Sequence, residues 1–149
     1  MNIRTENGKP ASEEAISNLE SALGFSISGH FKAFLRTQDG AEPENNILHG
    51  NYNVGIDGFI PLDQILEERG YIENLPERAY PVAWAACGNI VYIDEGKGGS
   101  VFFWDHEDSD NVTELASDFD AFTNLLEPFD IDAIEMNPDQ MISVTRRIV

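Results

Sequence analysis

The densest group of reactive side chains lies in the acidic segment WDHEDSDN. Asp105, His106 and Glu107 place two carboxylates around an imidazole, a combination that can exchange protons or bind a metal. A calcium loop that starts at Asp105 needs Gly at its sixth and Glu at its twelfth position, which here are Asp110 and Ala116. A zinc motif H-E-x-x-H fails because Asp110 occupies the position of the second histidine. The segment therefore favours a strand that runs into an acidic turn, with a small metal-dependent hydrolase at these three residues as an alternative.

Two further features resemble catalytic motifs without completing one. Cys87 would need a nearby base and an electropositive setting to act as a nucleophile, and the segment around His106, the candidate base, is acidic. We therefore expect Cys87 to be a small buried residue. The glycine-rich stretch GKGG, residues 96–99, lacks the G-x-x-x-x-G-K-[ST] spacing of a phosphate-binding loop and enters a strand pattern. The sequence predicts no enzyme: no catalytic residue, no metal site and no cofactor.

The charge of the chain is strongly one-sided. The sequence contains 9 Lys and Arg against 27 Asp and Glu, which gives a net charge of −18. Nucleic-acid-binding proteins gain affinity by neutralising phosphates with cationic side chains, so direct binding to nucleic acid is not expected. A basic protein partner is favoured instead, although the same charge also serves solubility.

The cysteine content and the hydrophobic patterning bear on the compartment. The 149-residue sequence contains one cysteine, which excludes an internal disulfide and favours a reducing environment. The polar start MNIRTENGKPASEE has no apolar signal-peptide region, and no apolar run reaches the length of about 20 residues that spans a bilayer. We expect a cytoplasmic protein without a membrane segment.

The spacing of apolar residues predicts an α+β fold in which helices flank a mainly antiparallel β-sheet. Ser12 and Gly24 have the residue types of a helix N-cap and a helix end, and Ser117 with Asp120 resembles a capping box. The order of helices and strands differs from the alternating pattern of parallel sheets. The predicted helices are 12–24, 28–40, 63–68 and 117–126, and the predicted strands lie near Val54 and at 81–84, 90–94 and 100–105.

A glycine-rich turn joins the last two predicted strands and sets their register. If Asp94 pairs with Ser100, then Ile90 lies opposite Trp104. The same register places the segment 87–89 beside the residues 105–107 at one end of the sheet. Both faces of these strands carry apolar side chains, which is typical of a central position in a sheet.

Six segments follow one another in the order EEAISNLESALGFSIS, HFKAFLRTQDG, GFIPLDQI, YPVAWAACGNIVYID, GSVFFWDHE and LASDFDAFTNLL. Taken together in this order, they resemble the SUKH superfamily, the cell-wall-assembly-regulator-like domain found among bacterial toxin-immunity proteins. Two departures are the Cys87-Gly88-Asn89 sequence, where members often have Gly-Gly-Asn, and the absence of a proline before the second helix. The resemblance covers roughly residues 12 to 126, so we expect one SUKH-like domain over residues 1–149, with residues 127–149 as a C-terminal extension.

The resemblance implies a non-enzymatic protein that binds and blocks a cognate toxin, often a nuclease. Combined with the charge, it predicts that an acidic surface meets a basic toxin. A regulatory or scaffold domain without a toxin partner is the alternative with the same fold. Charge and position in loops, including the long connection 41–58, select the candidate contact residues. They are Asp39, Glu42, Glu44, Tyr52, Asp57, Asp105, Glu107 and Asp108.

Overall fold

The computed structural model describes residues 5–44, 47 and 55–126. Fourteen short or medium-length elements follow one another along this part of the chain. In order they are β1 (Thr5–Glu6), α1 (Glu13–Leu23), α2 (Gly29–Gln38), β2 (Glu42–Pro43), β3 (Ile56–Phe59), the 3-10 turn η1 (Leu62–Gln64), α3 (Ile65–Gly70), β4 (Ala79–Ala85), η2 (Ala86–Gly88), β5 (Ile90–Asp94), η3 (Glu95–Lys97), β6 (Ser100–Asp105), β7 (Asp108–Ala116) and α4 (Phe119–Asn124).

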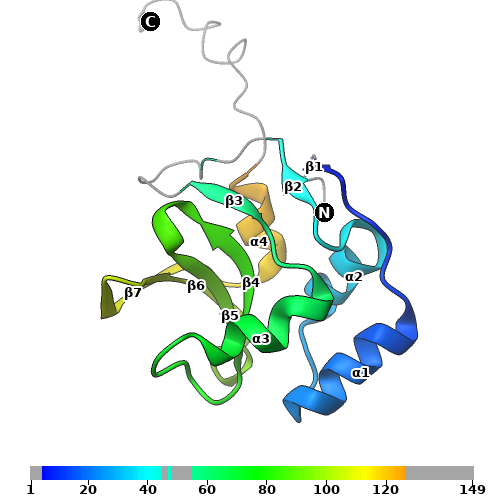
Figure 1. Ribbon diagram of the computed structural model, residues 1–149, viewed down its shortest axis with the longest axis horizontal. Coiled ribbons are helices and arrows are strands. Elements are labelled where there is room, and N and C mark those ends of the chain that lie inside the picture. Colours follow the sequence, from blue (N-terminus) through cyan, green and yellow to red (C-terminus); the bar gives the residue numbers. More distant parts are fainter. Residues whose placement is uncertain (1–4, 45–46, 48–54, 127–149) are drawn as a thin grey trace, which may run out of the picture.

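The central feature is a five-stranded antiparallel sheet in the order β3-β4-β5-β6-β7. Strands β1 and β2 form a separate two-stranded antiparallel sheet. Figure 1 shows α1 and α2 to one side of the large sheet, with α3 passing in front of its lower end. This architecture confirms the predicted α+β fold with a mainly antiparallel sheet flanked by helices.

The first two helices form where the sequence predicts them. In α1, Ile16, Leu19 and Leu23 are buried along one face, as helical periodicity requires. The Ser12 hydroxyl accepts a hydrogen bond from the Ala15 amide, and Gly24 ends the helix in a left-handed conformation with φ 88°. Phe31, Phe34 and Leu35 of α2 likewise face the core.

Aromatic rings fill the space between α2, α4 and the sheet. The Phe119 ring of α4 lies 5.0 Å from that of Phe31 and 5.3 Å from that of Phe34, both in edge-to-face geometry. Phe59 of β3 completes the cluster, with its ring 4.5 Å from that of Phe34. All four side chains are at most 1% exposed, so they tie the helices to the sheet.

The predicted register of the central hairpin is confirmed. Asp94 pairs with Ser100 and Ile90 pairs with Trp104. Tyr92 stacks on its cross-strand neighbour Phe102 at a ring distance of 5.4 Å. Apolar residues occupy both faces of these strands, in line with their central position in the sheet.

Three local predictions are wrong. The acidic stretch after the β6–β7 turn is the nine-residue edge strand β7, where β6 supplies hydrogen-bond partners and an edge position tolerates charged side chains. The N-cap of α4 is Asp118, whose carboxylate accepts from the Ala121 amide at 2.7 Å, so Ser117 lies outside the cap. Asp63 falls inside η1, and the α-helix starts two residues later.

Within residues 5–44, 47 and 55–126, no helix has both the length and the apolar character needed to span a membrane. The expected strand near Val54 and the extension 127–149 lie outside the described residues.

Candidate functional site

Three short strands bring four carboxylates around one hollow of about 490 Å³. The pairing of β1 with β2 sets Glu6 opposite Glu42, and residues opposite each other on antiparallel strands project to the same side. The Asn7 amide donates to the Glu42 carboxylate at 3.2 Å and so links the two strands further. Six residues line the hollow: Glu6, Glu42, Pro43, Glu44, Ile56 and Asp57.

Strand β3 forms the other wall of this hollow. Its burial alternates at the start, with Ile56 buried and Asp57 exposed, so the carboxylate of Asp57 remains in solvent. The Phe59 amide donates to the Ala41 carbonyl at 2.8 Å and fixes β3 beside β2. Among the described residues that line the hollow, none is cationic. We refer to Glu6, Glu42, Glu44 and Asp57 as the carboxylate hollow.

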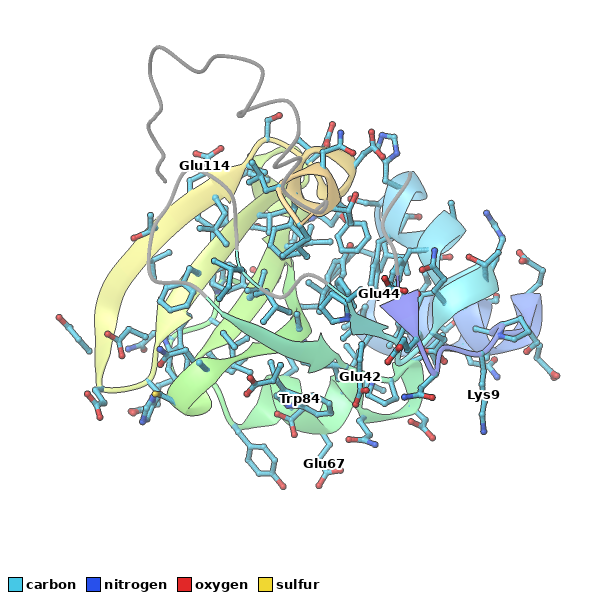
Figure 2. The ribbon with its side chains drawn as sticks, turned by 90° about the horizontal axis from the view of Figure 1, so that it is seen from above. Lys9, Glu42, Glu44, Glu67, Trp84 and Glu114 are labelled. Atoms are coloured by element: carbon cyan, nitrogen blue, oxygen red, sulfur yellow. The ribbon has the colours of Figure 1, made fainter. Side chains whose placement is uncertain are left out.

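The structure brings together three of the candidate residues chosen from the sequence, namely Glu42, Glu44 and Asp57. Figure 2 shows Glu42 and Glu44 near each other, with Glu114 of β7 well away from both. Glu6 was missed, because a strand of two residues has no periodicity to detect and its partner lies far along the chain. Tyr52 lies outside the described residues.

Asp39 has a different setting. Its backbone pairs with that of Lys9, and its carboxylate accepts a hydrogen bond from the Leu62 amide at 2.8 Å. Partial burial raises the pKa of this carboxyl group above its ordinary value, opposed by the Leu62 hydrogen bond and reinforced by the nearby charge of Asp63. The Asp39 side chain therefore holds the start of η1 beside the end of α2.

Two substitutions at Asp39 distinguish the contribution of its charge from that of its hydrogen bond with Leu62. Asp39→Ala should lower the free energy of unfolding by about 1 kcal/mol, because the Leu62 amide loses its acceptor, whereas Asp39→Asn keeps an acceptor. The pKa of Asp39 is higher in the folded than in the unfolded protein, so the free energy of unfolding of the wild type falls as the pH rises and the carboxyl group ionises. Asp39→Asn has no such group, so its stability relative to the wild type should increase from about pH 3 to about pH 7. Urea unfolding of the three proteins at both pH values measures this. Equal losses in both variants would contradict the assignment.

The remaining candidates lie at the turn between β6 and β7. Asp105 pairs with Asp108 across the turn, and the Asp105 carboxylate accepts from the Glu107 amide at 2.9 Å. The His106 amide and its Nδ1 atom both contact Asn89 Oδ1, at 3.0 and 2.8 Å, as the predicted register requires. Because the Asn89 oxygen can only accept, Nδ1 carries the ring proton.

The chemistry available at this turn is limited. The His106 ring is exposed, and its Nε2 atom lies 4.0 Å from the Glu107 carboxylate. Across the described ranges, no group of three or more His, Cys, Asp and Glu side chains is placed to hold a metal ion.

Cys87 is exposed in the connection between β4 and β5, with φ 65°, so the prediction that it is buried is wrong. At Cys87 the chain turns out of the sheet between β4 and β5, and the thiol is therefore exposed to solvent.

The carboxylate hollow and the β6–β7 turn lie at the same end of the large sheet. Ile56 pairs with Ala85 at the end of β4, and Ile90 at the start of β5 pairs with Trp104 near the end of β6. Strand β3 is three strand steps from β6, which corresponds to about 14 Å. One binding partner can therefore reach both groups of carboxylates.

Comparison with known families completes the description. The model of the SMI1 / KNR4 family (SUKH-1) matches residues 10–125, close to the span over which the sequence resembles the SUKH superfamily. A search of curated proteins finds no match. Since the match covers well over half of the sequence, the chain belongs to the SMI1 / KNR4 family (SUKH-1).

Proposed function

We propose that this protein is an immunity protein without catalytic activity, which binds a basic toxin in the cytoplasm and blocks it. Family membership supports a role in protein binding. The net charge of −18 supports a basic partner, because long-range attraction speeds the encounter and disfavours neutral or acidic proteins.

The carboxylate hollow is the observation that carries the proposal. Four carboxylates from β1, β2, the residue after β2, and β3 surround one open space, and no cationic side chain among the described lining residues neutralises them. Placing like charges together costs energy in the free protein, and a Lys or Arg side chain that enters the hollow removes this cost. Arg is especially suited, because its planar guanidinium binds carboxylates in bidentate geometry.

The proposed contact surface extends from the hollow to Asp105, Glu107 and Asp108 at the same end of the sheet. Tyr52 is retained as a proposed aromatic contact. Asp39 is proposed as a positioning residue, since its carboxylate is engaged by the Leu62 amide. Carboxylates spaced along one end of the sheet would take the place of phosphates on a nuclease toxin.

A co-expression experiment tests the proposal directly. The C-terminal domain encoded by the neighbouring gene is induced with and without this protein, and cell survival is scored. We expect the domain to be toxic alone and survival to be restored by co-expression, with a stable complex in pull-down. If the domain is toxic and this protein gives no protection, that pairing is removed and the regulatory or scaffold role gains support.

A further inference from the structure

Helix α3 and the residue that follows it expose large apolar side chains. Leu66 is 44% exposed and Tyr71, directly after the helix, is 67% exposed, whereas their neighbour Ile65 is fully buried against the core. The Tyr71 hydroxyl donates to the Glu67 carboxylate at 3.0 Å, four residues earlier. This bond holds the aromatic ring on the helix surface, so a partner would find it already ordered.

A hollow of about 330 Å³ lies beside these residues. Among the described residues that line it, Arg69 alone is cationic. Its guanidinium donates to the carbonyls of Ala79 and Glu77 at 2.9 and 2.6 Å and is therefore engaged in holding α3 to β4. Glu67 and Glu73 are exposed, and each is next in the sequence to a residue that lines the hollow. Six residues line the space: Leu66, Arg69, Gly70, Ile72, Asn74 and Leu75. Three of these residues, Leu66, Ile72 and Leu75, are apolar, and their position next to exposed carboxylates suits an apolar side chain that stands next to cationic ones.

Trp84 links α3 to the strand that borders the carboxylate hollow. The Trp84 indole donates to the Glu68 carboxylate of α3 at 3.0 Å, and Trp84 pairs with Gly58 of β3. A Cβ atom at Gly58 would lie 3.7 Å from Cγ of Glu42, so Glu42 covers the position where Gly58 has no side chain. Figure 2 shows Glu42, Trp84 and Glu67 on the same side of the molecule. The half-buried Trp84 therefore lies between α3 and strand β3, and β3 forms one wall of the carboxylate hollow.

We propose that this surface, made of Leu66, Glu67, Tyr71 and the hollow beside them, docks a basic segment of the partner that inserts an apolar side chain. The inference rests on the proposed function for the basic character of that partner, and it adds an apolar contact that charge alone does not provide. A second copy of this chain fits poorly, because a two-fold interface would bring Glu67 and Glu73 close to their own equivalents.

A pair of peptides tests the proposal on the full-length protein. The first is a 15-residue helical peptide with arginines around two leucines spaced four residues apart, and its twin carries serines in place of the leucines. Binding of both is measured by fluorescence anisotropy for the wild type, Leu66→Ser and the control Val112→Ser. Val112 is matched to Leu66 because it is 41% exposed but lies on β7, at the far edge of the sheet.

We expect the wild type to bind the leucine peptide about tenfold more tightly than the serine peptide, as burial of an aliphatic side chain predicts. Leu66→Ser should remove most of this preference and Val112→Ser should retain it. The same preference in all three proteins, or none in the wild type, would overturn the proposal. A wild-type dimer by light scattering that Leu66→Ser dissociates would also overturn it, in favour of self-association.

The peptide result and the survival result are separate. A leucine preference that depends on Leu66 supports the docking surface even if the neighbouring toxin is not the partner. Protection from the toxin without a leucine preference would leave the immunity role standing and remove the α3 surface from it.

Discussion

Replacing Phe119 with alanine should lower the free energy of unfolding by about 3–5 kcal/mol. The ring is fully buried and lies 5.0 to 6.1 Å from the rings of Phe31, Phe34, Phe59 and Phe122. Its removal leaves a cavity that four packed rings cannot fill without moving α2 or β3. Because domains of this size are stable by about 5–15 kcal/mol, the loss is a large part of the total.

Urea unfolding followed by tryptophan fluorescence and circular dichroism measures this loss. Phe103→Ala is the matched control, since this phenylalanine on β6 is only partly buried and its removal should cost clearly less. A loss at Phe119 no larger than that at Phe103 would show that α4 does not anchor the core.

Reversing two charges of the carboxylate hollow should weaken the complex with the toxin by about 100-fold at low salt. In the Glu42→Lys/Glu44→Lys variant, cationic side chains would face the basic partner, and juxtaposed like charges cost several kcal/mol. The deficit should shrink in about 1 M salt, where the Debye length falls to about 3 Å.

The control variant is Glu14→Lys/Glu114→Lys, which makes the same change in net charge at exposed positions on α1 and β7. Calorimetric titration of the toxin domain that passes the survival test, at low and high salt, compares the two variants. Similar weakening in both would mean that net charge, and not the hollow, determines binding.

Local residue patterns were sufficient to predict helix α1 and the register of the β5–β6 hairpin. The face of α1 follows from the spacing of Ile16, Leu19 and Leu23, and its ends follow from Ser12 and Gly24. The Asp94–Ser100 register follows from the length of the glycine-rich turn between β5 and β6. These features depend on residues close together in the sequence, so they can be predicted from local patterns.

Features that depend on distant partners were harder to predict. The acidic residues at the start of β7 predict a solvated turn, whereas their strand conformation comes from pairing with β6. The apolar character of Cys87 predicts a position in the core, but its φ of 65° places it in an exposed turn.

The candidate site shows the same division. Glu42, Glu44 and Asp57 could be selected from charge and loop position, and the structure brings them into one hollow. Glu6 could not be selected, because only the long-range pairing of β1 with β2 brings it there. The separate role of Asp39 depends on its contact with Leu62, which lies 23 residues further along the chain.

The strand order also has a kinetic consequence. Each strand of the large sheet pairs with the next strand in the sequence, so β4 to β7 can assemble by closing short loops, at a small cost in chain entropy. The contact between Asn7 and Glu42, which helps to shape the carboxylate hollow, joins residues 35 positions apart. We therefore expect folding to proceed outward from the β4–β7 meander and to complete the hollow late. The part of the molecule proposed to meet the partner would then also be the first to open, which gives it freedom to adapt while the sheet stays folded.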